Sequence, residues 1–247
     1  NCNAAGFAGQ EGSATSGFCG IEFLVGSSRN DTLIGDDVAM MWNVGDKQLT
    51  EASSQRMLRW DSFETLIGGA GKDTFFNLRA ASATSLLGGA GDDSLDASDA
   101  TAPVTLRGGD GNDTLIGGSS ADKLDGGDGG DELTGGLGND TLSGGAGDDA
   151  LDDTLGTNQL DGGIGNDAIR FVGTWTLGAT GSGLSFTSIE VIQGAGSADV
   201  LAGTSGADLF SVTADGVFSR NVQNQIFQGF ETLQGGLGVD TVTGQDQ

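Results

Sequence analysis

A period of nine residues runs through Gly108–Arg170 and constrains the fold more than any other feature of the chain. The run reads GGDGNDTLI, GGSSADKLD, GGDGGDELT, GGLGNDTLS, GGAGDDALD, DTLGTNQLD and GGIGNDAIR. Six of these seven units start with Gly-Gly, six carry Asp at position six, and all have Leu or Ile at position eight. A tandem unit this short predicts a solenoid, in which each turn packs only on its neighbours.

Each conserved position of the unit has a physical role. Glycine at positions one, two and four lets the backbone adopt positive φ and lets neighbouring chains approach closely. Position six supplies one carboxylate per unit, at Asp113, Asp122, Asp131, Asp140, Asp149 and Asp167, with Asn158 in the sixth unit. Calcium takes about six to eight oxygen ligands from carboxylates and backbone carbonyls, so the pattern predicts calcium binding at the loops.

Position eight is the obligatory apolar position. It is filled by Leu115, Leu124, Leu133, Leu142, Leu151, Leu160 and Ile169. A strand of three residues buries one such side chain and cannot fold alone, so it must stack on neighbours in a parallel array.

The units resemble the hemolysin-type calcium-binding (RTX) repeat, GGxGxDxUx. The resemblance implies an all-β fold, a right-handed parallel β-roll or β-solenoid with two units per turn and calcium ions between loops two repeats apart. On that phasing one edge carries Asp113, Asp131, Asp149 and Asp167, and the opposite edge carries Asp122, Asp140 and Asn158. The implied carbonyl ligands are those of Gly109, Gly111, Gly127, Gly129, Gly136, Gly138, Gly145, Gly147, Gly163 and Gly165. Asn158 predicts a weak or absent site, and Ser120 at position four alters its own loop.

Similar loops occur outside the central run. They add the metal-ligand candidates Asp31, Asp73, Asp93, Asp199, Asp208 and Asp240. We therefore expect one continuous solenoid, with degenerate repeats over 26–107, the central roll over 108–170, and strands with further degenerate repeats over 171–247.

Four predicted strands share the pattern apolar-Glu-x-apolar-x-Gly, at Ile21–Gly26, Phe63–Gly68, Ile189–Gly194 and Phe230–Gly235. Their glutamates are Glu22, Glu64, Glu190 and Glu231. These residues are either solvated strand residues or braces for the calcium site in the loop that follows each strand.

Residues 36–62 are the least repetitive part of the chain. Within them Lys47–Trp60 is predicted to form a helix, because Leu49, Ala52, Arg56 and Arg59 recur at helical spacing with no Gly or Pro between them. We interpret this segment as a helical excursion that covers one face of the solenoid.

Residues 1–25 contain Cys2 and Cys19, the two cysteines of the chain. A disulfide between them, stabilising the fold by about 3 kcal/mol, is the favoured interpretation and would cap the N-terminal end of the solenoid. The alternative is a pair of buried thiols. A chain that begins at Asn1 suggests a processed precursor or an excised segment, and no apolar stretch is long enough to span a membrane.

The charge balance restricts the partners. With 35 acidic and 10 basic residues, the net charge of −25 disfavours nucleic acid and anionic membranes as partners. About a dozen calcium ions would neutralise the chain. Without calcium, charge repulsion and the 47 glycines should leave much of the chain unfolded.

An enzymatic role is not expected. The chain has no histidine, which excludes a Ser-His-Asp triad and a histidine zinc site, and its two cysteines cannot supply four metal ligands. The prominent aspartates are already explained by their repeat phase. Ice binding on a threonine array is disfavoured because Lys123 and Glu132 interrupt position seven.

Two functional hypotheses remain. The first is an extracellular or cell-surface calcium-binding structural protein, such as a filament, surface-layer, biofilm-matrix or adhesin subunit, that folds on binding several calcium ions and self-associates head to tail. The alternative is the C-terminal secretion and folding module of a type I-secreted exoenzyme or toxin. We favour the first, because such modules usually lack cysteine and no catalytic domain precedes the repeats in this sequence.

Overall fold

The computed structural model describes residues 30–35, 37–52, 57–79, 84–152 and 156–171, together with short strands on either side of them. Regular structure in these residues consists of β-strands arranged in three sheets. The nine-stranded sheet runs in the order β1 (Ser13–Ala14), β3 (Thr32–Ile34), β7 (Thr65–Ala70), β9 (Thr84–Ala90), β11 (Val104–Asp110), β13 (Lys123–Asp128), β15 (Thr141–Ala146), β17 (Gln159–Ile164), β20 (Ser185–Thr187).

A fifteen-stranded sheet lies opposite the first sheet. Its order is β2 (Phe23–Val25), β6 (Met57–Asp61), β5 (Gln48–Glu51), β4 (Met40–Asn43), β8 (Thr74–Phe76), β10 (Ser94–Asp96), β12 (Thr114–Ile116), β14 (Glu132–Thr134), β16 (Ala150–Asp152), β18 (Ala168–Phe171), β21 (Val191–Gly194), β25 (Ile226–Gln228), β24 (Phe218–Ser219), β23 (Leu209–Val212), β27 (Thr241–Gly244). The third sheet contains β19 (Thr174–Thr176), β22 (Val200–Ala202) and β26 (Thr232–Gln234).

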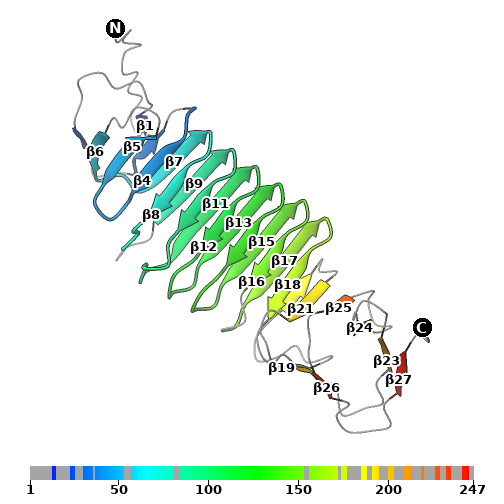
Figure 1. Cartoon of the computed structure of the whole chain (residues 1–247). Coiled ribbons are helices and arrows are strands. Elements are labelled where there is room, and N and C mark those ends of the chain that lie inside the picture. Colours follow the sequence, from blue (N-terminus) through cyan, green and yellow to red (C-terminus); the bar gives the residue numbers. More distant parts are fainter. Residues whose placement is uncertain are drawn as a thin grey trace.

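The central chain alternates between the two large sheets, so each coil uses one strand of each. Strand β11 pairs in parallel with β13, with Leu106 beside Leu124, and β12 pairs with β14, with Leu115 beside Leu133. Figure 1 shows these coils stacked side by side along one axis. The predicted parallel β-solenoid with two nonapeptides per turn is therefore confirmed.

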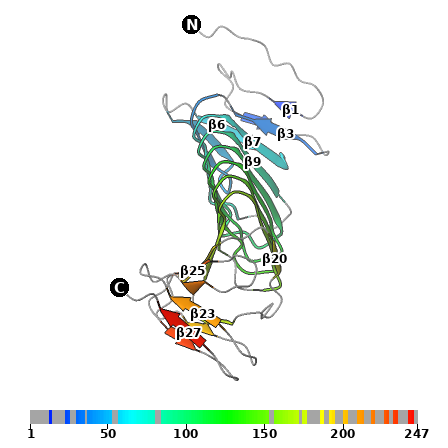
Figure 2. The ribbon, with the colours of Figure 1, turned by 90° about the vertical axis from the view of Figure 1, so that its right-hand side faces the viewer.

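The core is a narrow column with one large apolar side chain per strand, which follows from the single apolar position of the repeat. Its fully buried leucines include Leu86, Leu95, Leu106, Leu115, Leu124, Leu133, Leu142 and Leu151. At the N-terminal end the column widens to hold Trp42, which stacks on Phe75 with 5.1 Å between ring centroids. Figure 2 shows the same coils overlying one another, with β7 and β9 near one end.

We expect Leu124→Ala to destabilise the folded chain by about 2–5 kcal/mol, because Leu124 is fully buried between Leu106 and Leu142. Denaturant unfolding in saturating calcium measures the difference. Lys123→Ala is the matched control, since Lys123 is exposed on the same strand and its loss should cost under about 0.5 kcal/mol. Equal costs for the two variants would contradict the column-like core.

The predicted helix over Lys47–Trp60 is wrong. Strands β4, β5 and β6 form an antiparallel sheet segment here, with Trp42 beside Leu49 and Leu49 beside Leu58. Side chains alternate along β4, where Met40 and Trp42 are buried and Met41 is exposed. The helical spacing was misleading because edge pairing of β4 on β8 extends an existing sheet, which an isolated helix could not do.

The strands predicted from the apolar-Glu-x-apolar-x-Gly pattern are present in the structure. Strands β2, β21 and β26 fall within three of the four apolar-Glu-x-apolar-x-Gly segments, and β7 begins in the fourth and extends two residues beyond it. Several predicted residues lie outside the described residues: Cys2 and Cys19, whose disulfide stays a prediction, the ligand candidates Asp199, Asp208 and Asp240, and Glu22, Glu190 and Glu231. In the described parts of the chain, no helix is long and apolar enough to cross a membrane.

Candidate metal sites along the edges of the solenoid

Six loops of the form Gly-Gly-x-Gly-x-Asp follow one another along one edge of the solenoid, which we call the calcium edge. They occupy residues 68–73, 88–93, 108–113, 126–131, 144–149 and 162–167. Each loop leads from the nine-stranded sheet to the fifteen-stranded sheet. The predicted grouping of Asp113, Asp131, Asp149 and Asp167 on one edge is confirmed, and Asp73 and Asp93 extend it.

The aspartates of this edge form a continuous ladder. The N–H of Asp113 donates to Oδ1 of Asp131 over 2.8 Å, and the N–H of Asp131 donates to Oδ1 of Asp149 over 2.8 Å. The same contact joins the remaining neighbours, Asp73 to Asp93, Asp93 to Asp113, and Asp149 to Asp167, at 2.7–2.9 Å. One carboxylate oxygen of each ladder residue therefore holds the preceding coil in register.

The second carboxylate oxygen indicates a cation. Oδ2 is buried with no hydrogen-bond donor in Asp73, Asp93, Asp113, Asp131 and Asp149. A buried anionic oxygen without a donor is costly, and a bound cation is the usual compensation. The five atoms recur at one position of the repeat, so they mark one kind of site repeated along the edge.

The space beside each Oδ2 is lined by backbone. A Cβ on Gly108 would lie 2.0 Å from Oδ2 of Asp113, and the equivalent distance from Gly126 to Asp131 is 2.2 Å. Among the described residues, no three His, Cys, Asp or Glu side chains converge as a metal cluster. The available donors are thus one carboxylate per loop plus peptide carbonyls, an all-oxygen set that suits calcium.

Most of the glycines predicted to supply carbonyls have positive φ, for example Gly109 at 125° and Gly111 at 128°; Gly165 does not, and Gly136 and Gly138 lie in the loop of the opposite edge. Four equivalent glycines were not among the predicted ligands, and their φ values are 120–122°: Gly69, Gly71, Gly89 and Gly91. The same GGAG motif precedes Asp73 and Asp93. The two copies lie 20 residues apart, which is not a multiple of nine, so the nine-residue pattern does not align them with the central loops.

Gly109→Ala should destabilise the calcium-loaded chain by more than about 1 kcal/mol. Its φ is 125° and the added Cβ would lie 2.0 Å from the carbonyl oxygen of Gly89, so neither the backbone nor the neighbour accommodates it. Thermal unfolding in excess calcium tests this expectation. Asp110→Ala serves as control, because position three already holds alanine at Ala90 and Ala146; a destabilisation as large as that of Gly109→Ala would contradict the argument.

Burial changes the protonation of the ladder in the metal-free chain. Desolvation raises the pKa of Asp73 and Asp113 to about 7 and that of Asp93 and Asp149 to about 6, although backbone hydrogen bonds oppose it. Burial also raises the pKa of Asp131. Protons and calcium therefore compete for these carboxylates.

The metal-free folded form should lose stability as the pH rises from about 4 to about 7. A carboxyl whose folded pKa exceeds its unfolded pKa binds more protons when folded, so stability is greatest below the unfolded value and falls through the folded one. Calcium binding should strengthen over the same interval. Isothermal titration calorimetry at pH 5.5 and pH 7.5 measures the calcium affinity. Equal affinities at the two pH values would contradict the raised pKa values of the ladder aspartates.

The opposite edge confirms the predicted grouping of Asp122, Asp140 and Asn158. The N–H of Asp122 donates to Oδ1 of Asp140 over 2.7 Å, and the N–H of Asp140 donates to Oδ1 of Asn158 over 2.8 Å. Asn158 thus keeps the ladder contact while it lacks the carboxylate. The Oδ1 of Asp122 makes the same contact with the N–H of Val104, and Asp122 differs in that its Oδ2 also accepts from the N–H of Gly118.

Glu64 takes the ladder position in an early coil. Its Oε2 accepts from the N–H of Asp31 over 2.9 Å, and Thr32 and Thr65 pair directly after them. Glu64 therefore braces the preceding coil at Asp31. The two alternatives considered for it were a solvated strand residue and a brace for the following loop at Asp73. A glutamate replaces aspartate here because the longer side chain still reaches the neighbouring amide.

A second, exposed ladder at position five was missed. The N–H of Gly130 donates to Oδ1 of Asn112 over 2.7 Å, and the N–H of Asn112 donates to Oδ1 of Asp92 over 3.0 Å. The contact recurs between Asn166 and Asp148 over 2.9 Å. The preference of these loops for Asn or Asp at position five is the signal that could have identified it.

The comparison with protein families agrees with this geometry. The model for the RTX calcium-binding nonapeptide repeat (4 copies) matches residues 17–37, 83–100, 105–133, 134–169, 187–212 and 227–247. No curated protein matches the chain significantly. Because the matched segments cover more than half of the chain and contain most of the loops described above, this protein belongs to the family with RTX calcium-binding nonapeptide repeats.

Proposed function

We propose that this chain is an extracellular structural protein whose coils fold when calcium binds along their edges. The observation that supports it most directly is the row of buried Oδ2 atoms without a hydrogen-bond donor in Asp73, Asp93, Asp113, Asp131 and Asp149. Calcium would supply the positive charge that makes their burial favourable. Millimolar free calcium is typical outside cells, where weak sites of this kind fill.

Secretion is the usual fate of RTX repeat proteins and supports an extracellular or surface location. The net charge of −25 agrees with a chain that remains largely unfolded until calcium is available. A predicted Cys2–Cys19 disulfide would fit the same oxidising environment.

The proposed role is structural and non-catalytic. In the described residues, the carboxyls with the most strongly raised pKa values lie in the ladder of the calcium edge, where each already has an architectural contact. Perturbed carboxyls can also mark catalytic sites, but here their regular spacing explains them.

Self-association of the solenoid is the finer part of the proposal. The large sheets consist mainly of parallel strands, and a sheet edge of this kind can accept a strand from another copy. Head-to-tail contacts do not close, so they would give filaments or a surface lattice.

Size-exclusion chromatography with light scattering, followed by negative-stain microscopy, tests the assembly. We expect elongated assemblies in millimolar calcium, and their loss in chelator followed by recovery when calcium is restored. Monodisperse monomers at high concentration in calcium would contradict self-association. That result would favour the alternative, a calcium-folded module of a larger exported protein.

A further inference from the structure

The edge opposite the calcium edge is built differently in its first half. We call the part formed by residues 43–46, 77–79, 97–103 and 117–122 the seam. Apolar side chains close it, since Val44, Leu78, Ala97 and Ala100 are at most 7% exposed. Its two earlier coils lack Gly-Gly-x-Gly-x-Asp, which explains why the coils at Asp73, Asp93 and Asp113 are 20 residues apart whereas later ones are 18 apart.

Hydrogen bonds within the chain join the coils along the seam. The N–H of Val44 donates to the carbonyl of Phe76 over 3.0 Å, and the N–H of Ala97 donates to the carbonyl of Ile116 over 2.8 Å. The N–H of Ser119 donates to the carbonyl of Ala100 over 3.1 Å. An equivalent contact joins later coils, where the N–H of Gly135 donates to the carbonyl of Asp152 over 3.3 Å, so the seam differs from them by its apolar closure.

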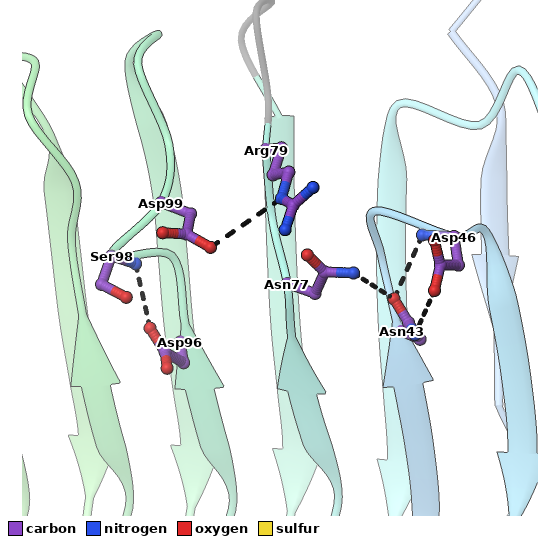
Figure 3. A network of polar contacts seen from close by, with 7 residues as sticks. All are labelled: Asn43, Asp46, Asn77, Arg79, Asp96, Ser98 and Asp99. Carbon is purple, nitrogen blue, oxygen red and sulfur yellow. Dashed lines mark hydrogen bonds and ion pairs between the residues drawn. The ribbon is translucent and has the colours of Figure 1, made fainter.

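Polar side chains reinforce the same region. Figure 3 shows Nδ2 of Asn77 donating to Oδ1 of Asn43 over 2.9 Å, while Asn43 also caps the turn at Asp46. In the next coil the N–H of Ser98 donates to Oδ1 of Asp96 over 2.9 Å. The backbone N–H groups of Asp46 and Ser98 in these turns therefore donate to side-chain oxygens of the protein itself.

The carboxylate ladder of this edge is interrupted along the seam. Val104, which is 2% exposed, lies where Asp122 lies in the following coil. Asp122 itself has both oxygens occupied, with the N–H of Val104 at 2.8 Å and the N–H of Gly118 at 2.6 Å. It acts as a backbone cap at the end of the seam, and the next ladder aspartate on this edge is Asp140.

We propose that the seam holds the N-terminal coils in register without calcium, so that they fold at lower free calcium than the central coils. This inference rests on the proposed function and adds the order in which the coils fold. Coils up to β12 need cations on one edge, whereas the coil that follows also carries a Gly-Gly-x-Gly-x-Asp loop at 135–140 on the opposite edge. The more weakly charged end would then present a folded template on which later coils add.

Hydrogen exchange read by mass spectrometry across a calcium titration tests the order. Peptides within 65–110 should gain protection at several-fold lower free calcium than peptides within 132–171 of the same molecule. A common midpoint for both regions, or an earlier midpoint for the central coils, would overturn the inference. If no region responded to calcium, the proposed function would fail instead, so the two failures are distinguishable.

Variants of the seam test its cause. Ala100→Asp places a carboxylate where a buried alanine contacts Gly118, and it should move the N-terminal midpoint to that of the central coils. Ser98→Asp adds the same charge at an exposed position of the same loop and should leave the order unchanged. If Ala100→Asp fails to fold in excess calcium, Leu78→Ala provides the milder test. An unchanged midpoint in Leu78→Ala would overturn the role of the seam.

Discussion

Chelation of calcium at neutral pH is expected to abolish most of the β-sheet circular dichroism of this chain, and readdition of calcium should restore it. The 35 acidic residues repel one another, and the ladder brings carboxylates into successive coils with one oxygen buried and lacking a donor in five of them. The 47 glycines add a large conformational entropy to the unfolded chain. Metal binding and folding should therefore occur together.

Magnesium provides the matched control for this experiment. It demands near-octahedral geometry and gives up its water reluctantly, so the same concentration of magnesium should restore much less structure than calcium. Equal recovery would indicate simple charge screening. An unchanged spectrum in chelator would contradict the coupling between calcium and folding.

The second large effect is expected from a reciprocal pair of substitutions, Asp131→Asn and Asn158→Asp. The Asp131 carboxylate accepts from the N–H of Asp113, while the N–H of Asp131 donates to Asp149, so the carboxylate links its own loop to the loop of the preceding coil. The asparagine can still accept the hydrogen bond from Asp113, but it loses the charge and the buried Oδ2. We expect fewer bound calcium ions and a higher calcium midpoint for folding.

Asn158→Asp makes the opposite exchange at the 1% exposed position of the other edge. It keeps the acceptor for the N–H of Asp140 and adds a carboxylate to the ladder, so the number of bound calcium ions should rise. Equilibrium dialysis of both variants beside the unmodified chain measures the change. Matching changes in both variants, whether losses or gains, would contradict the assignment of one carboxylate ligand per loop.

Asn158→Ala extends the comparison. The amide of Asp140 would lose its 2.8 Å acceptor in a buried site, which should cost about 1–3 kcal/mol of stability. The number of bound ions should stay the same, because Asn158 brings no carboxylate. Stability and calcium stoichiometry therefore report separate properties at this position.

The repeating architecture follows from the order of the residues alone. One Leu or Ile at position eight and one Asp at position six predicted a parallel stack with carboxylates on two edges, as seen for Leu115, Leu124, Asp113 and Asp122. Such features are predictable because every coil repeats the same local environment, so period and phase carry the three-dimensional information.

Other features depend on which coil lies next to which, and these were visible only in the folded chain. Strands β4 to β6 replaced the predicted helix because β8 offered an edge for pairing. Glu64 turned toward Asp31 because register placed that amide opposite its carboxylate. Asp122 became a backbone cap because the fold of its own loop brings the N–H of Gly118 to its second carboxylate oxygen. A single sequence defines the repeat, whereas these contacts arise between residues that only folding brings together.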